Sequence, residues 1–182
     1  MDDPLYTPLF CEENIWQLAR QLVDDGVDAA TLQVIVISNP QRQVMLLKQR
    51  NGSELGYVVW DYHVVLRQRE GEVDSIYDFD TLLSFCSNSR DYLGATFGAQ
   101  QKMPPTYRAQ LRVIPAASYL RNFSSSRRHM DGQIPEEAFP AWEMITPGHG
   151  EAVQLEEYWD MTLQLDDGSR VMSVDEFMAQ EL

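Results

Sequence analysis

Hydrophobic positions recur with a helical period near the start of the chain. Counted from Ile15 to Leu22, apolar side chains are spaced i, i+3, i+4 and i+7, which predicts an amphipathic helix that begins near Cys11. Gly26 follows the last of these positions, and glycine is the residue type that most often ends a helix in a left-handed conformation. A helix over roughly this segment is therefore expected to lie against a core.

The pattern then changes to short runs that are typical of strands. Leu32–Ser38 and Val44–Gln49 flank a turn at Asn39-Pro40 and predict a hairpin, and Gly56–Gln68 and Ser75–Asp80 predict further strands. The later elements predicted are a helix over Arg90–Phe97, a strand over Gln110–Ile114, a helix opened by Pro115, a long ordered loop over Ser124–His149 and a last helix behind the capping box Ser173–Glu176. An early helix, a run of strands and later helices predict an α+β fold with a mostly antiparallel sheet flanked by helices.

Length and charge narrow the class of protein. The 182 residues fit a single domain, 1–182. Lys and Arg number 14 against 28 Asp and Glu, so the formal charge of -14 opposes binding to nucleic acid or to anionic membranes. Met1–Pro4 lacks the features of a signal peptide, and no apolar run is long enough to span a bilayer. We therefore expect a cytoplasmic protein, and nothing in the sequence demands more than a monomer.

The strand predicted over Gly56–Gln68 carries ionisable residues among valines. Alternation along one continuous strand would place Asp61 and His63 on the same face, and both faces of this segment are largely apolar. A buried histidine needs a partner. A two-residue turn at Glu70-Gly71 would set Asp78 opposite His63, whereas a four-residue turn would set Asp80 there. Either carboxylate could accept the Nδ1 hydrogen of the imidazole and fix its tautomer.

A histidine oriented by a carboxylate suits a nucleophile, and the chain has two cysteines. Cys11 and Cys86 lack the spacing of a redox or zinc motif, which predicts free thiols. Cys11 is the better candidate because unpaired N–H groups at a helix start favour a thiolate and can stabilise an oxyanion. Glu12 and Glu13 oppose the thiolate by repulsion, so His63 would have to supply positive charge.

Each of these residues also has a structural explanation. A buried histidine bonded to a carboxylate is more often structural than catalytic, and a cysteine at a helix start can be a small buried side chain. His129 and His149 are read as ordinary loop residues, and Trp60 and Tyr62 as core residues. No metal-ligand cluster or phosphate-binding glycine loop is present.

Several sequence blocks carry a resemblance to a known family. The blocks are CEENIW from Cys11, VISN from Val36, WDYHVVL from Trp60, IYDFDT from Ile76 and SYLRNFSSSRRHM from Ser118. Together they resemble the protein N-terminal glutamine amidohydrolases. The resemblance covers roughly the first 130 residues, and is weak from Gln133 onward.

The resemblance implies a compact cysteine hydrolase of the papain and transglutaminase group with a Cys-His-Asp triad. It makes Cys11 the nucleophile, His63 the general base and acid, and Asp78 the orienting carboxylate. It favours the two-residue turn, or a bulged equivalent of it, over the alternative with Asp80. The implied reaction converts the side-chain amide of an N-terminal glutamine to glutamate through a thioester. The implied substrates are peptides or proteins that begin with glutamine, and the reaction requires no cofactor and no metal.

Recognition of a free chain terminus requires a group that binds the α-ammonium. Glu13, Asp61 and Asp80 are the candidates because they lie beside the triad positions along the sequence. The chain departs from the family at Ser126, where an acidic residue is expected, and at Asp166–Ser169, where a Gly-Trp-Gly segment is expected. Three alternatives therefore stay open: a deamidase or acyl transferase that acts on an internal glutamine, a peptidase, and a non-catalytic module that binds peptide termini.

Overall fold

The fold is built on one six-stranded sheet in which every neighbouring pair of strands is antiparallel. The computed structural model describes residues 4–52, 56–148 and 151–181. The strand order is β10-β7-β1-β4-β5-β6. These strands are β1 (Leu32–Ser38), β4 (His63–Glu70), β5 (Val73–Tyr77), β6 (Cys86–Asn88), β7 (Gln110–Pro115) and β10 (Arg170–Ser173). The predicted α+β class with a mostly antiparallel sheet is confirmed.

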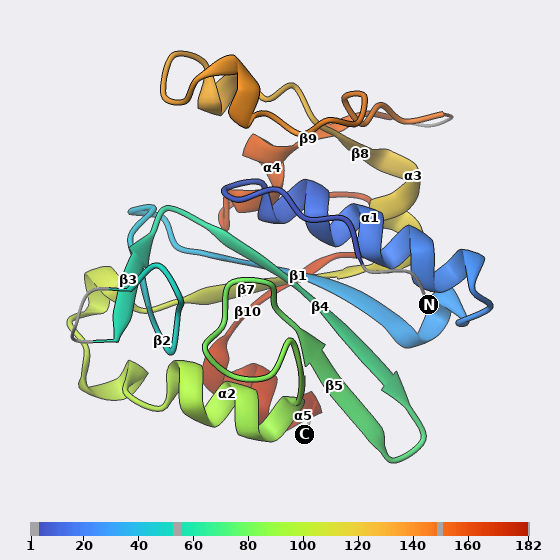
Figure 1. Ribbon diagram of the computed structural model, residues 1–182. Coiled ribbons are helices and arrows are strands. Elements are labelled where there is room, and N and C mark those ends of the chain that lie inside the picture. The colour runs from blue at the N-terminus through green and yellow to red at the C-terminus, as the bar shows by residue number, and fades with distance from the viewer. Residues whose placement is uncertain (1–3, 53–55, 149–150, 182) are drawn as a thin grey trace.

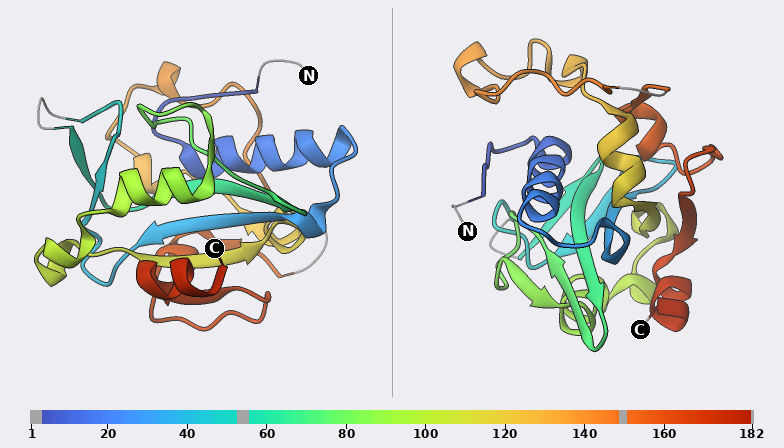
Figure 2. Two further views of the ribbon diagram at one scale, coloured as in Figure 1. Left: turned by 90° about the horizontal axis from the view of Figure 1, so that it is seen from below. Right: turned by 90° about the vertical axis from the view of Figure 1, so that its right-hand side faces the viewer.

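Helices cover both faces of this sheet (Figures 1 and 2). They are α1 (Cys11–Asp24), α2 (Ser89–Phe97), α3 (Ala116–Asn122), α4 (Leu155–Trp159) and α5 (Val174–Glu181). One apolar cluster joins α1, α3 and α4 to strand residues such as Val34 and Val64. A second cluster joins α2 and α5 to the opposite side chains, such as Ile35 and Val65. The alternation of inward residues along β1 and β4 thus supplies both layers of the core.

The local signals for the first and last helices are confirmed. Gly26 has a φ of 97°, and the N–H groups of Gly26 and Val27 bond back to the carbonyls of Val23 and Leu22, which is a Schellman motif. At the other end, the Ser173 hydroxyl accepts from the Glu176 N–H at 3.2 Å, while the Glu176 carboxylate accepts from the Ser173 N–H at 2.8 Å. None of the helices in the described ranges combines the length and the apolar composition that a bilayer span requires.

The hairpin predicted between the first two strands is wrong. β1 pairs with β4 and β7, while β2 (Val44–Leu47) pairs with β3 (Tyr57–Trp60) in a separate two-stranded sheet. A β-branched run such as Leu32–Ser38, apolar on both faces, belongs in the interior of a large sheet, and it takes its neighbours from distant parts of the chain.

The strand predicted over Gly56–Gln68 is two strands in two different sheets. β3 ends at Trp60 and β4 begins at His63, and the two residues between them belong to neither strand. The alternation predicted a buried Asp61, and this prediction is wrong: Asp61 is exposed. The chain changes direction there and turns the Asp61 side chain toward Arg42. Tyr62 is buried as expected and faces α1.

The remaining segments are mostly irregular. The prediction of a long loop after Ser124 is confirmed in outline, and β8 (Phe123–Ser124) begins it and pairs in parallel with β9 (Val153–Gln154). His149 lies outside the described residues. Short 3-10 turns connect other elements: η1 (Ala29–Thr31), η2 (Gln100–Lys102), η3 (Pro105–Tyr107), η4 (Arg128–Met130) and η5 (Glu136–Ala138). β6, α4 and β10 are short and were not predicted from the sequence.

Candidate active site

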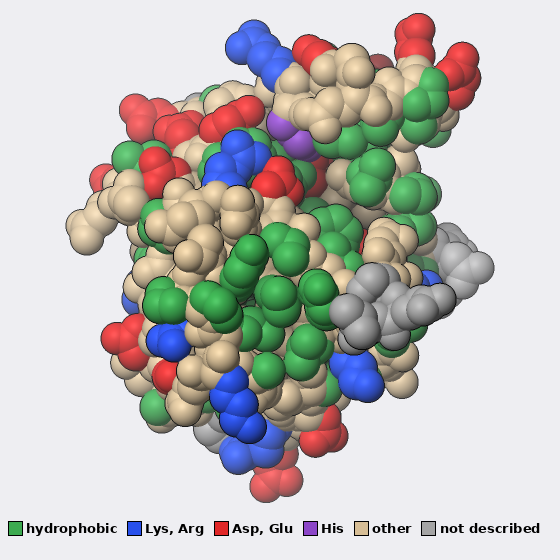
Figure 3. Space-filling view, turned by 90° about the vertical axis from the view of Figure 1, so that its left-hand side faces the viewer, with side chains coloured by type: hydrophobic (Ala, Val, Ile, Leu, Met, Phe, Trp, Pro, Cys, Tyr) green, Lys and Arg blue, Asp and Glu red, His purple; other side chains and the backbone are tan. Residues whose placement is uncertain are grey.

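A cavity of about 640 Å³ lies between the start of α1, the β3–β4 connection and the η4 turn. Cys11, His63 and His129 are among the residues that line it. Figure 3 shows a histidine at the surface between acidic and basic side chains, above a broad area of hydrophobic side chains. Segments that are distant in sequence therefore meet around this cavity.

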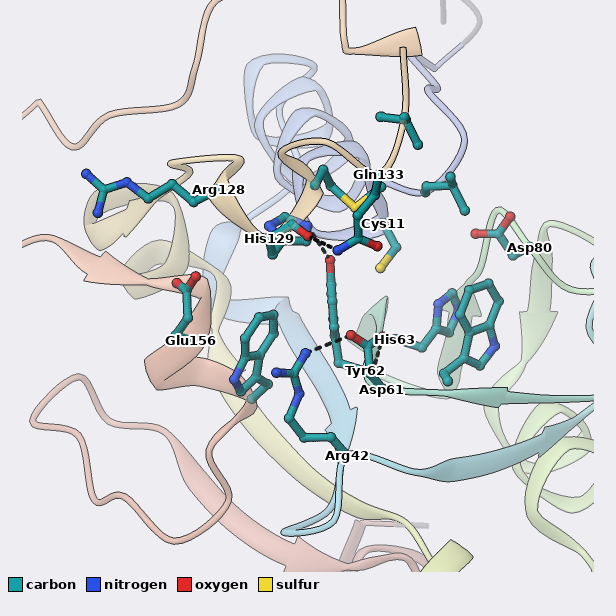
Figure 4. Close-up of a pocket in the computed structure, with 15 residues that line it drawn as sticks. Cys11, Arg42, Asp61, Tyr62, His63, Asp80, Arg128, His129, Gln133 and Glu156 are labelled. Atoms are coloured by element: carbon teal, nitrogen blue, oxygen red, sulfur yellow. Dashed lines mark hydrogen bonds and ion pairs between the residues drawn. The ribbon is translucent and has the colours of Figure 1, made fainter. Parts of the chain in front are cut away.

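Cys11 is the first residue of α1, as the periodicity predicted. The preceding residue, Phe10, has no side chain that can cap the helix, so the N–H groups of the first turn have no side-chain partner at that position. The Cys11 side chain is buried, and Figure 4 shows its sulfur pointing into the cavity on the side where His63 lies. Both cysteines are free thiols, and Cys86 is exposed.

His63 lies at the start of β4 and forms a buried pair with Asp78. Its Nε2 is 2.9 Å from Asp78 Oδ1, and both side chains are almost fully excluded from solvent. The expectation that Nδ1 faces the carboxylate is wrong, because Nε2 makes this contact. Nδ1 is buried without a hydrogen-bond partner and remains available to a group in the cavity.

The register of the β4–β5 hairpin differs from the one that the resemblance favoured. Glu70 pairs with Val73 and Leu66 with Tyr77, as the longer turn predicts. Asp78 nevertheless reaches the imidazole, because β5 ends at Tyr77 and the Asp78 N–H bonds to the carbonyl of Phe85. The carboxylate is therefore supplied by the segment beyond the strand, and not by a residue directly opposite His63.

Hydrogen bonds fix the Asp78 carboxylate. Oδ1 also accepts from the Asp80 N–H at 2.9 Å, and Oδ2 accepts from the Tyr92 hydroxyl at 2.8 Å and from Gln49 Nε2 at 3.2 Å. Burial alone would raise the pKa of Asp78, but His63 and these donors hold it below its usual value. The carboxylate is thus ionised and oriented toward the imidazole.

The electrostatics favour a positive charge on His63. Burial alone would lower the pKa of His63, but the carboxylates of Asp78 and Asp80 outweigh it and raise the pKa. Burial raises the pKa of the Cys11 thiol, and Glu12 and Asp80 add to this effect. An imidazolium beside Cys11 is the charge that can offset these influences and stabilise a thiolate.

The same residues include a group of metal-ligand type. His63, Asp78 and Asp80 each place one ligand atom within 4.8 Å of the others, which is the one such group of three among the described residues. His63 Nε2 and Asp78 Oδ1 already bond to each other, as in a histidine that is oriented by a carboxylate.

Comparisons with known proteins identify the family. The model of the family N-terminal glutamine amidase matches residues 6–181. The chain belongs to this family. A protein N-terminal glutamine amidohydrolase from Arabidopsis thaliana is 35% identical over 167 residues, 86% of this chain and 75% of that protein. A protein N-terminal glutamine amidohydrolase from Bos taurus is 33% identical over 181 residues, which cover 97% of this chain and 86% of that protein. A protein N-terminal glutamine amidohydrolase from Homo sapiens is 37% identical over 131 residues, which cover 71% of this chain and 64% of that protein.

The three acidic residues expected to bind the substrate do not occupy equivalent places. Asp80 and Asp61 line the cavity, but Glu13 does not. Asp80 is almost fully buried, and its Oδ1 accepts from the Tyr6 hydroxyl at 3.0 Å. Asp61 is about half exposed and is paired with Arg42 at 2.7 Å.

Glu13 is fully buried and already bonded. Its carboxylate accepts from Arg127 Nε at 2.8 Å and Nη2 at 2.7 Å, from Trp142 Nε1 at 2.6 Å and from the Ser125 hydroxyl. This set of contacts ties α1 to the long loop that carries η4, which indicates a structural role.

Removal of the Glu13 carboxylate should destabilise the fold. The change Glu13→Ala leaves the Arg127 guanidinium, 11% exposed, without its partner. Loss of one member of such a pair costs about 3–5 kcal/mol in free energy of unfolding. Chemical denaturation measures this, with the exposed Glu143→Ala as the matched control. Normal stability together with weakened substrate binding would return Glu13 to the substrate site.

His129 is one of the cavity residues that were not predicted from the sequence. It was read as an ordinary loop residue, but its Nε2 lies 3.1 Å from the Tyr62 hydroxyl, and its ring contacts Phe10 and Trp159 edge-on. Burial lowers the pKa of His129. The position of His129 depends on η4 packing over α1, a long-range contact that local sequence does not encode.

Proposed function

We propose that this chain hydrolyses the side-chain amide of an N-terminal glutamine to glutamate and ammonia, with Cys11 as nucleophile, His63 as acid and base, and Asp78 as the orienting carboxylate. The family membership supports the activity. The observation that carries the residue roles is the buried His63–Asp78 pair, whose free Nδ1 shares a cavity with Cys11.

The arrangement supports a cysteine hydrolase of the papain and transglutaminase type. In this chain the candidate nucleophile begins a helix, and the candidate base comes from an antiparallel sheet packed against that helix. Cys11 at the start of α1 and His63 at the start of β4 fit this description. The α1 helix also contacts β4 in the apolar cluster, which fixes the two elements relative to each other.

The first half of the reaction forms a thioester. The Cys11 thiolate adds to the carboxamide carbon of glutamine, and the carbonyl oxygen becomes an oxyanion that N–H groups in the first turn of α1 can stabilise. The His63 imidazolium gives its proton to the amide nitrogen. The C–N bond then breaks, ammonia leaves, and the acyl group remains on the sulfur.

The second half of the reaction releases glutamate. The imidazole, now neutral, takes a proton from a water molecule, which adds to the thioester carbon. Collapse of this second intermediate breaks the C–S bond and restores the thiolate beside the imidazolium. Asp78 stabilises the imidazolium in both halves and keeps Nε2 toward itself, so that Nδ1 exchanges the proton.

Asp80 is the best placed of the expected residues to bind the α-ammonium of the substrate. It lines the cavity, it is bonded at Oδ1 by the neutral hydroxyl of Tyr6, and no cation is paired with it in the described residues. Asp61 lies at the rim with Arg42, and Glu13 is bonded to Arg127. An ammonium group therefore finds at Asp80 a buried carboxylate that is not bonded to a cation.

The change Asp80→Asn should selectively weaken the recognition of a free terminus. Loss of one charge-assisted hydrogen bond is worth about 10- to 100-fold in kcat/KM. A peptide that begins with glutamine is compared with its analogue that lacks the α-amino group. The preference for the free amine should fall in Asp80→Asn and persist in Asp61→Asn. An unchanged preference in Asp80→Asn contradicts this assignment.

Ammonia release tests the activity itself. The substrates are a peptide that begins with glutamine, the same peptide with an acetylated N-terminus and a peptide with glutamine at the second position. Release from the first peptide alone is expected. Equal release from all three would indicate a deamidase of internal glutamine, shorter fragments in the mass spectrum would indicate a peptidase, and binding without release would indicate a module that only holds chain termini.

A further inference from the structure

Glu12 lies directly behind the nucleophile and has no partner of opposite charge within hydrogen-bond distance. The residue is fully buried. Its Oε2 accepts from the Tyr62 hydroxyl at 2.8 Å and lies 3.8 Å from Cys11 Sγ (Figure 4 shows Tyr62 and Cys11). Its Oε1 has no hydrogen-bond partner. His129 Nε2, which is positively charged only when the imidazole is protonated, lies 3.6 Å from Oε1.

The groups around Glu12 supply no free positive charge. The titratable groups that face it are Cys11, Glu13, Tyr62, His63, Tyr119 and His129. His63 is paired with Asp78, and Arg127 is paired with Glu13. Burial lowers the pKa of His129 and favours its neutral form.

A carboxylate in this position would be costly. It would be buried without a cation and with one oxygen unpaired, which the protonated acid avoids in part by being uncharged. Burial raises the pKa of Glu12 to about 8, although the hydrogen bond from Tyr62 opposes this shift. The neighbouring acid in the chain, Glu13, has four donors instead, so the two glutamates of the first turn differ in environment.

The charge on Glu12 acts on Cys11. A negative charge 3.8 Å from the sulfur disfavours a thiolate, and its repulsion is among the causes that raise the pKa of the thiol. A protonated Glu12 removes this repulsion. It also leaves Oε2 as an acceptor for Tyr62, so the wall of the cavity keeps its shape.

We propose that Glu12 is a positioning residue that carries a proton in the active enzyme, and that loss of this proton shifts Cys11 from the thiolate toward the thiol. The inference rests on the proposed role of Cys11 as nucleophile. It concerns the thiol itself, however, so it can be tested without turnover.

The test is the rate at which iodoacetamide alkylates Cys11 as a function of pH, in a Cys86→Ser background that removes the exposed thiol. The variant Glu12→Gln has no carboxyl group to ionise. It should be alkylated about tenfold faster than the Glu12 protein at about pH 9, a shift of about one pKa unit, and at a similar rate at about pH 6. Glu72→Gln, in the exposed β4–β5 turn, should follow the Glu12 profile.

Two results would overturn the inference. One is the same alkylation profile in Glu12→Gln and in the Glu12 protein. The other applies even if Glu12→Gln does not fold: infrared spectra of the Glu12 protein that lack the stretching band of a protonated carboxyl group at neutral pH. Absence of ammonia release together with the expected alkylation profiles would contradict the proposed function and leave the role of Glu12 intact.

Discussion

Replacement of Cys11 by alanine is expected to lower kcat for an N-terminal glutamine peptide by at least about 10⁴-fold, because Cys11 is the one thiol among the described residues that line the cavity. The fold should persist, since alanine fits within the space of the buried cysteine at the start of α1. Ammonia release measured beside a thermal unfolding curve separates the two effects.

The matched control for this change is the second thiol. Cys86 lies in β6 at the edge of the sheet and is exposed, so Cys86→Ala should retain the full rate. Activity of Cys11→Ala above about one per cent of the starting rate would mean that water or another residue attacks the amide. Loss of activity in Cys86→Ala would mean that the nucleophile has been assigned to the wrong cysteine.

The change Asp78→Asn should lower kcat by about 10⁴-fold, which is the loss seen when the carboxylate of such a triad becomes an amide. Asn keeps the shape of the side chain and its contacts with Tyr92 and Gln49 can be made in part, but the charge that stabilises the imidazolium is gone. Because Asp78 raises the pKa of His63, that pKa should fall in the variant. Less imidazolium at neutral pH then means less thiolate on Cys11.

The measurement is the pH dependence of kcat together with the alkylation rate of Cys11. Asp24→Asn, at the exposed end of α1, is the control for a change of one charge. If Asp78→Asn retained a rate within about tenfold of the original enzyme, the His63–Asp78 pair would be structural, as the sequence alone also permitted.

Local elements could be predicted from sequence because their signals are local. The periodicity of α1, the left-handed Gly26 and the Ser173–Glu176 capping box each involve residues a few positions apart, and each is found in the structure. Strand pairing could not be predicted, because the partners of β1 are 25 or more positions away in β4 and β7. A short apolar run carries no information about which strands it will pair with.

In the candidate active site, too, local features could be predicted from the sequence and long-range contacts could not. The hairpin left Asp78 and Asp80 open as partners of His63, and the resemblance favoured Asp78. The wrong ring nitrogen and the wrong register were expected, since the chain leaves the strand after Tyr77. The roles of Glu12, Glu13 and His129 depend on the long loop folding back over α1. The sequence shows two adjacent acids at Glu12 and Glu13, and only the packing shows that one is bonded to Arg127 while the other is not.

Covalent labelling tests whether Cys11 attacks the side-chain carbonyl carbon of an N-terminal glutamine. The probe is a peptide whose first residue carries a diazoketone in place of the carboxamide, and the labelled residue is found by peptide mapping. We expect a single label, on Cys11, which blocks further labelling. A peptide that begins with glutamine should slow the labelling reaction. Inactivation with the label on another residue, or equal labelling by the N-acetylated probe, would contradict this expectation.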